Sequence, residues 1–395
     1  MSIPSINFAR RIGLGAAIGI LAAGGALAEE SAEEQRQAAL VMIGTIAFES
    51  PDVLGGTASA LGMSCASCHP RGGTQTRLFI DTLSDKPGNV DVTNGVFSPL
   101  TEDNIINPIN IPSLFGARHT EPFGRRGNFE TIADFTVHAI VNEFIGQQPS
   151  DSLLEAMVAF QTTLDFPANR FLSEDGRLTA DASASARRGE AIFAAPGACA
   201  TCHKPADYFV DHLTHDVGTD GVFETPSLLG SAITAPYAHD GRFDTVAEAV
   251  DHFVGWLRLD LDAAAKADLL AYVEAVGVAE RTEALNEEQA LRQRFSDFGD
   301  LMARLIALDD AALTTLAIGH INRSFKAIQM YYRDPPQRPT RKVLGAWMEA
   351  LRVVERHAEA SESDAAREAL GAYNVRIDTD ALPLSSQETD GHSRY

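Results

Sequence analysis

Cysteine and basic residues are scarce in this sequence. The 395-residue chain has only four cysteines, too few for a disulfide-stapled scaffold of this length. It has 32 Lys and Arg against 54 Asp and Glu, which gives a formal net charge of −22. Nucleic acids and anionic membranes repel such a chain, so both are excluded as partners. A basic or weakly charged protein partner remains.

Long apolar runs are also missing. The apolar run at 12–23 follows Arg10 and Arg11 and precedes Ala26-Leu27-Ala28, the pattern of a removable export signal. The run is short for a membrane span, although a retained anchor is the alternative interpretation. We therefore predict a signal peptide at 1–28, a periplasmic location and no membrane span after cleavage.

All four cysteines fall in two copies of one motif, Cys65-Ala-Ser-Cys68-His69 and Cys199-Ala-Thr-Cys202-His203. Two thiols three residues apart can each form a thioether to a haem vinyl group, and the adjacent imidazole then lies under the iron. A zinc site would need tighter knuckle spacing, and a thioredoxin-like dithiol would need a surrounding βαβ pattern. The motifs predict two covalently bound haem c groups, with His69 and His203 as proximal ligands.

Apolar periodicity predicts an all-α fold. Helices are expected at 33–49, 131–144, 152–164, 182–194, 245–256, 263–276, 283–308, 311–332 and 341–357. Gly, Pro and Asn make 70–110 and 204–241 loops, long enough to wrap a haem. We predict a first cytochrome c-like domain at 29–170, a second at 171–280, a helical appendage at 281–360 and a mostly flexible acidic tail at 361–395.

The two halves repeat each other. Ile111–Gly116 matches Thr225–Gly230 at an offset of 225 − 111 = 114, and the same offset pairs Gly127 with Gly241 without a gap. The repeated segments follow the two haem motifs, as expected if the halves share an ancestor.

The same offset pairs His138 with His252, each in the helix after its loop. This placement suits a sixth ligand to each iron, whereas ordinary core or surface histidines retained by descent are the other interpretation. No methionine lies between Met157 and Met302, so the second haem cannot take His/Met ligation from its own domain. Tyr237 is the fallback ligand for the second iron.

Together with the two haem motifs, Thr225-Pro226-Ser227-Leu228 and the segment 234–243 (TAPYAHDGRF) resemble the bacterial di-haem cytochrome c peroxidases and their MauG-type relatives. The resemblance covers roughly residues 33–280. It implies two facing cytochrome c domains, in which the first haem meets peroxide and the second relays electrons from a small cytochrome c or cupredoxin. MauG-type members instead oxidise a protein substrate. A homodimer is one assembly that the resemblance allows.

The resemblance also implies a calcium ion between the domains, at positions that match Asn110, Thr234 and Pro236. Oxygen-only ligation suits calcium. The family's inter-haem tryptophan has no counterpart, because the matching place reads Arg125-Arg126-Gly127.

This departure from the family pattern, together with the paired His138 and His252, leaves three classes of function open. If His138 can leave its iron, Arg125, Arg126 and Glu143 are the candidates for assisting O–O cleavage, and the protein is a peroxidase-like oxidoreductase that moves electrons between a partner protein and an oxidant such as hydrogen peroxide. If both distal histidines stay bound, it is a pure electron-transfer cytochrome with two bis-His haems. A redox or ligand sensor is the third interpretation.

Overall fold

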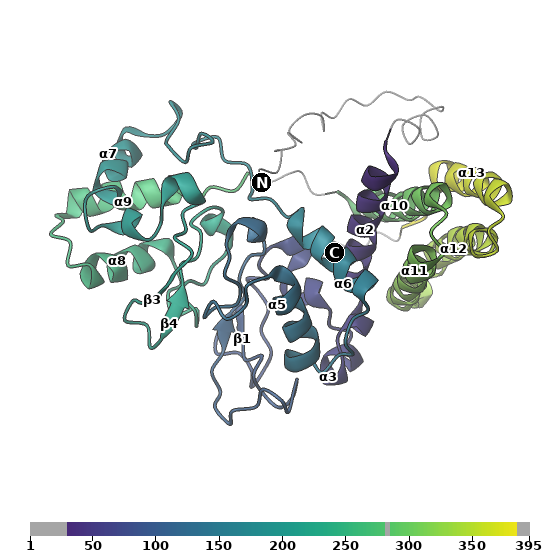
Figure 1. Cartoon of the computed structure of the whole chain (residues 1–395), viewed down its shortest axis with the longest axis horizontal. Helices are drawn as coiled ribbons and strands as arrows, with labels where there is room; N and C mark the ends of the chain where they lie inside the picture. Colours follow the sequence, from purple (N-terminus) through teal and green to yellow (C-terminus); the bar gives the residue numbers. More distant parts are fainter. Residues whose placement is uncertain (1–29, 281–284, 385–395) are drawn as a thin grey trace, which may run out of the picture.

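The computed structural model describes residues 30–280 and 285–384. It is mostly helical, as predicted, and its helices form three groups in a row (Figure 1): a second unit (171–280) on the left, a first unit (30–170) in the centre and a C-terminal bundle (285–384) on the right. The predicted signal peptide lies outside the described residues. Within them, no helix combines the length and apolarity that a bilayer span requires.

The first unit places its haem motif between helices. It contains α2 (Ala32–Phe48), α3 (Gly56–Ala60), α4 (Cys65–Cys68), α5 (Ile132–His138) and α6 (Asp151–Thr162). A single π-helical turn (Ala139–Glu143) continues α5. The predicted loop after the motif is irregular except for the short antiparallel pair β1 (Asn89–Val90) and β2 (Ile109–Asn110).

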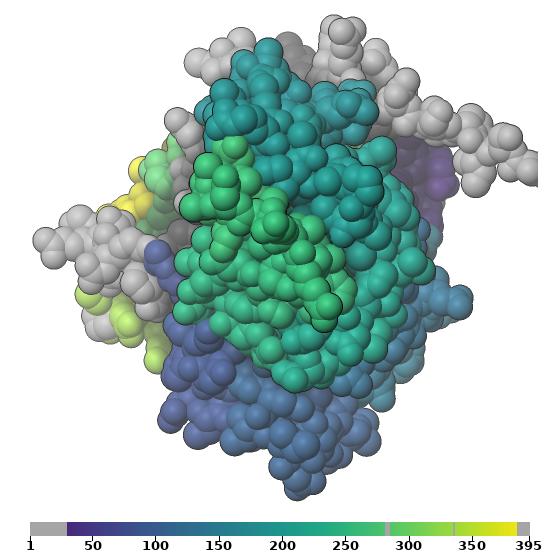
Figure 2. Space-filling view, turned by 90° about the vertical axis from the view of Figure 1, so that its left-hand side faces the viewer, coloured from purple at the N-terminus to yellow at the C-terminus, as the bar shows by residue number. Residues whose placement is uncertain are grey.

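The second unit has the same plan with fewer residues. It contains α7 (Ala184–Phe193), α8 (Val246–Trp256) and α9 (Ala263–Val276), with β3 (Thr214–Asp216) paired to β4 (Val222–Glu224) in the loop. Figure 2 views the molecule from this end, with the second unit in front and the first unit forming the lower edge.

Each unit crosses its first and last helices at a glycine. A Cβ on Gly44 of α2 would lie 2.0 Å from the carbonyl oxygen of Ala156, and one on Gly189 of α7 would lie 1.9 Å from that of Asp268. Only glycine therefore allows these close approaches. Four residues beyond each partner, aromatic rings meet: Phe48 with Phe160 at 5.1 Å, and Phe193 with Tyr272 at 4.8 Å.

The backbone confirms the repeat of offset 114. Three matched features recur in both halves: a left-handed glycine, a cis X-Pro bond and a threonine N-cap on the following helix. These features are Gly116 and Gly230, Glu121-Pro122 and Ala235-Pro236, and Thr131 and Thr245.

The C-terminal bundle is built from α10 (Glu287–Leu308), α11 (Ala311–Tyr331), α12 (Arg338–Glu359) and α13 (Ser363–Thr379). Its apolar core centres on Phe295, Phe298 and Trp347, and it extends to Leu40 and Ile43 of α2. The predicted appendage is thus packed on the first unit through one continuous core.

Helix α13 differs from the prediction of a mostly flexible tail beginning at residue 361. Leu370, Tyr373 and Ile377 are buried at helical spacing against the bundle. The surrounding Asp, Glu and Arg residues made this segment look solvated, whereas its apolar stripe holds it on α10 and α12.

Candidate functional site

Each cysteine motif forms one tight turn that brings its histidine back over its first cysteine. Cys65 begins α4, and the backbone N–H of His69 donates to the carbonyl oxygen of Cys65 at 2.9 Å. In the second motif the N–H of His203 donates to Cys199 at the same distance. None of the four cysteines forms a disulfide. Burial raises the pKa of the Cys65 thiol to about 12, so this pair is a poor thiolate nucleophile.

Both motif histidines have one ring nitrogen engaged by a backbone carbonyl. His69 Nδ1 lies 3.0 Å from the oxygen of Pro112, and His203 Nδ1 lies 3.1 Å from that of Phe209. An Nδ1–H donating to a carbonyl leaves Nε2 as the ligand atom, the usual arrangement for a metal-bound histidine. Burial lowers the pKa of His69 to about 4 and also lowers that of His203, which keeps both imidazoles neutral.

Apolar side chains surround the cysteines. Cys65 and Cys68 pack against a cluster that includes Leu54 and Phe97, and Cys199 packs against the cluster of Phe193 and Tyr272. An apolar lining around an iron site limits the access of water and sets the local dielectric constant. The donor set and its surroundings therefore fit a covalently bound haem in both units.

Two predicted residues meet beside the first motif. His138 ends α5, and its Nε2 lies 3.7 Å from Oε1 of Glu143 in the following π-helical turn. Burial raises the pKa of Glu143 to about 7. Burial also raises the pKa of Cys68, and the nearby Glu143 charge adds to that rise. The imidazole of His138 and the carboxyl group of Glu143 thus lie together beside the first motif, at the end of α5.

His252 occupies the matching place on α8 but has a different polar partner. Its ring lies 5.1 Å from that of Phe243, as the ring of His138 lies 4.8 Å from that of Phe129. However, His252 Nε2 lies 2.9 Å from the carbonyl oxygen of Val217. Ligation by this nitrogen would require it to leave that oxygen. Tyr237 donates its hydroxyl to the carbonyl of Ser231 at 2.8 Å.

Arg125 lies where the first and second units meet. Its Nη2 donates to Asn110 Oδ1 at 2.7 Å, and its carbonyl accepts from the N–H of Glu224 at 2.9 Å. The Asn110 amide donates to the carbonyl of Pro236 at 2.7 Å. Burial lowers the pKa of Arg125 to about 10 against the opposing pull of nearby carboxylates, and burial raises the pKa of Glu224 to about 7.

The remaining predicted residues lie outside this network. Arg126 is exposed, so the structure does not bring it to Arg125 and Glu143. Thr234 contacts Ser231 through its hydroxyl at 3.3 Å.

One further cluster could hold a metal among the described residues: Cys202, Asp211 and His215, with candidate ligand atoms within 4.8 Å of one another. Asp211 is already bonded to His215 Nε2 at 2.7 Å, and Cys202 belongs to the second haem motif. These three residues therefore surround that motif and do not form a separate centre.

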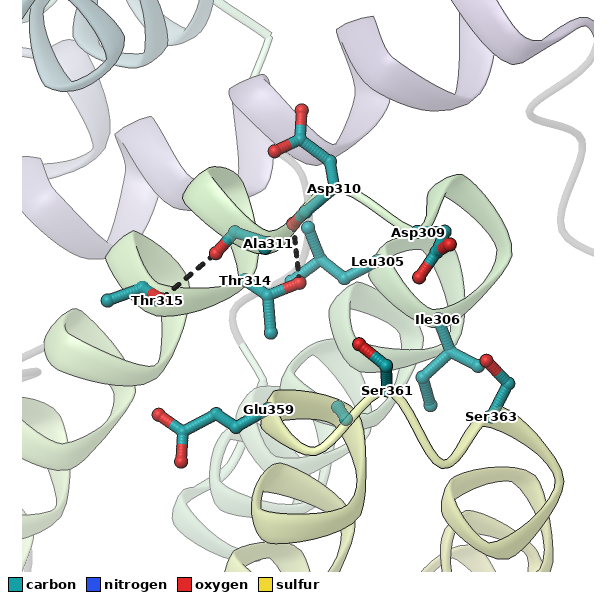
Figure 3. Close-up of a pocket in the computed structure, with 11 residues that line it drawn as sticks. Leu305, Ile306, Asp309, Asp310, Ala311, Thr314, Thr315, Glu359, Ser361 and Ser363 are labelled. Atoms are coloured by element: carbon teal, nitrogen blue, oxygen red, sulfur yellow. Dashed lines mark hydrogen bonds between the residues drawn. The ribbon is translucent and has the colours of Figure 1, made fainter.

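A pocket lies at the far end of the bundle, where α10 and α11 meet the turn into α13 (Figure 3). Leu305 and Ile306 line it, and Asp310 caps α11 above them. The hydroxyls of Thr314 and Thr315 donate back to carbonyls of their own helix at 2.7 and 2.9 Å. The side chains of Asp310, Thr314 and Thr315 are thus already hydrogen-bonded to the backbone at the start of α11.

Comparison with known families identifies the arrangement. The model for di-haem cytochrome c peroxidase matches residues 172–335, which include the second haem motif. Over this segment, which is less than half of its length, the chain is similar to the di-haem cytochrome c peroxidases. Members of a di-haem family carry two haem groups, which agrees with the two motifs of this chain. The match continues through α10 and α11, so the resemblance does not stop near residue 280 as predicted.

Two methylamine utilization proteins MauG are similar to the chain. The protein of Methylorubrum extorquens is 28% identical over 29% of this chain and 38% of its own length. The protein of Methylophilus methylotrophus is 22% identical over 54% of this chain and 76% of its own length. The chain thus matches well under half of the first relative. A solved MauG-like protein associated with microbial copper homeostasis aligns with a TM-score of 0.44 and 18% identity, covering 60% of this chain and 89% of that one.

Sequence reasoning missed two features of the site. One is the pair of carbonyl acceptors, Pro112 and Phe209, that orient the motif histidines. The other is the glycine crossing of the helices that flank each motif, for which the repeated Gly-x-x-x-Phe of Gly44–Phe48 and Gly189–Phe193 was a visible signal.

Proposed function

We propose that the protein is a periplasmic di-haem c-type oxidoreductase of the peroxidase type, which moves electrons between a partner protein and an oxidant such as hydrogen peroxide. Its first cytochrome c-like domain is residues 29–170 and its second is 171–280. Cys65, Cys68 and His69 would hold one haem, and Cys199, Cys202 and His203 the other. When bound, the haems would supply the electron storage and the peroxide-reducing chemistry.

The observation that carries this proposal is the asymmetry between the two units. Glu143 lies 3.7 Å from His138 at the first motif. The offset of 114 places Leu257 at the matching position of the second unit, and its neighbour Trp256 also lacks a carboxyl. Of the two units, only the first therefore offers a largely buried acid at this place to take or give a proton during O–O cleavage. We assign the peroxide-facing role to the first haem site and the electron-relay role to the second.

In this assignment, His138 is the ligand that must leave the iron, and Glu143 is the catalytic carboxyl group. Arg125 is a charge partner of Glu143, since its positive charge opposes the rise in the Glu143 pKa. Arg126 has no proposed role, because its side chain is exposed. At the second site, His252 remains the proposed sixth ligand. Its hydrogen bond to the carbonyl of Val217 would break when it binds the iron.

The partner is a basic protein, because the chain carries a formal charge of −22. A small cytochrome c or cupredoxin would deliver electrons, whereas a protein substrate would give them up, as in the MauG-type reaction. In both cases the partner loses electrons to the haem sites and the oxidant takes them up; the cases differ in whether the partner is a recyclable electron donor or the oxidised product.

The test is a comparison of wild type and Glu143→Gln in the oxidised and half-reduced states. Hydrogen peroxide should rapidly reoxidise half-reduced wild-type protein, and the variant should react roughly 100-fold or more slowly with an unchanged haem content. Asp134→Asn, an exposed acid near the start of α5, is the matched control and should behave as wild type. Indifference of wild-type protein to peroxide in both states would instead identify a pure electron-transfer cytochrome with two bis-His haems.

A further inference from the structure

The junction between the two units contains a partly buried positive charge that belongs to the chain itself, the guanidinium of Arg125. Family resemblance implies a calcium ion at Asn110, Thr234 and Pro236. Two of the oxygens that would bind it already accept hydrogen bonds. Asn110 Oδ1 accepts from Arg125 Nη2, and the carbonyl of Pro236 accepts from Asn110 Nδ2, both at 2.7 Å.

These two partners fix the orientation of the Asn110 amide. If the amide were turned over, its NH2 group would face the guanidinium and its oxygen would face the Pro236 carbonyl, and both contacts would be repulsive. Asn110 Oδ1 therefore points at Arg125, and a lone pair that calcium could use is already occupied by the guanidinium.

A calcium ion and Arg125 cannot share this oxygen at low cost. Calcium binds oxygen at about 2.3–2.6 Å, so the ion and the guanidinium nitrogen would lie on the order of 5 Å apart in a partly buried region. A divalent cation would balance the negative charge of the nearby carboxylates. Arg125 already does so, because it interacts with the carboxylates of Glu224, Glu143 and Asp240.

The guanidinium of Arg125 holds Asn110 of β2 within the first unit, and the amide of Asn110 then donates across the junction to the carbonyl of Pro236. The backbone carbonyl of Arg125 also crosses the junction, since it accepts from the N–H of Glu224 in β4. Other bonds across the junction run beside it: Asn89 donates to the carbonyl of Asp240 at 3.1 Å, and Lys86 pairs with Asp244 at 2.8 Å. An ion is not needed to connect these segments, because side chains already do so.

We propose that the guanidinium of Arg125 takes the place of the divalent cation at the junction, and that the protein holds its two haem units together without calcium. This inference concerns the architecture of the junction and does not depend on whether the protein reduces peroxide.

The first experiment uses wild-type holoprotein. After dialysis against EGTA, elemental analysis should find far less than one calcium per chain, and neither EGTA nor added CaCl2 should shift the thermal midpoint or the haem spectrum. One calcium per chain, whose removal lowers the midpoint and whose return restores it, would overturn the proposal.

The second experiment compares Arg125→Gln with Arg126→Gln, since Arg126 is the exposed neighbouring arginine. Arg125→Gln should lower the thermal midpoint by several degrees and should respond to CaCl2, because the junction carboxylates and Asn110 Oδ1 lose their cation. Arg126→Gln should resemble wild type in both respects. Equal midpoints for the two variants would contradict the proposal. If Arg125→Gln does not accumulate as holoprotein, the wild-type calcium measurement still decides.

Discussion

Gly189 of α7 lies directly against the carbonyl oxygen of Asp268 in α9, so that a Cβ at this position would be 1.9 Å from that oxygen. The contact sets how closely the two helices approach, and it holds Phe193 on Tyr272 beneath the second haem motif. The first prediction follows from it.

Gly189→Ala should destabilise the second unit by roughly 1–3 kcal/mol, because the backbone of α9 must move away. Thermal unfolding followed in the Soret band measures the loss. Gly255→Ala in α8 is the matched control, since nothing lies within 4 Å of a Cβ there. The control should be neutral or stabilising by up to roughly 1 kcal/mol. Equal stability of the two variants would show that the helices are not held at this distance.

The double variant Cys65→Ala/Cys68→Ala should contain about half the haem of wild type, because the first site loses both thioethers and the second keeps them. Haem per chain, measured as the pyridine haemochrome, gives the ratio. Cys199→Ala/Cys202→Ala should give the complementary half-loaded protein. Full haem content in either variant would contradict covalent attachment at that motif.

Trp347→Ala should cost about 3–5 kcal/mol, because Trp347 is fully buried in the core of the bundle and its indole N–H bonds to Asp380 at 3.1 Å. Denaturant unfolding followed by circular dichroism measures it. Trp256 is 43% exposed, and Trp256→Ala should cost far less. A small effect of Trp347→Ala would mean that the bundle core is not packed as described.

Glu355 gives the bundle a pH dependence. The side chain is buried in α12, its Oε1 has no hydrogen-bond partner, and burial raises its pKa from 4.5 to about 7. The folded state therefore holds the Glu355 proton more tightly than the unfolded state, and stability falls as the pH rises from about 4.5 through 7.

Glu355→Gln removes this titration. The variant should be more stable than wild type at pH 8, by something on the order of 3 kcal/mol, and equally stable at pH 4.5. Urea unfolding at the two pH values checks it, with the exposed Glu349→Gln of the same helix as control. A stability difference that does not change with pH would refute the assignment to Glu355.

The sequence predicted the helices well because their apolar spacing is regular. The predicted 263–276 coincides with α9, and both haem motifs lie on short helical turns. It predicted α13 poorly, because the stripe of Leu370, Tyr373 and Ile377 is narrow within a polar segment and its partners are distant in sequence.

The site was predictable only where one motif contains all its parts. The cysteines and their histidine are adjacent in sequence, so their chemistry was visible. The role of Arg125 was not, because Asn110, Pro236 and Glu224 reach it from separate segments and two units. Propensity and periodicity carry no information about such contacts.

Helix α2 has consequences for the order in which the protein is made. One side of α2 packs on α6, whereas Leu40 and Ile43 also contact the core of α10–α13, which is synthesised after residue 286. Until those residues emerge, an apolar stripe near the beginning of the polypeptide stays open to water and to other chains. Synthesis must therefore pass both cysteine motifs before the apolar stripe of α2 can be covered. A protein truncated after the second unit would leave that stripe exposed permanently.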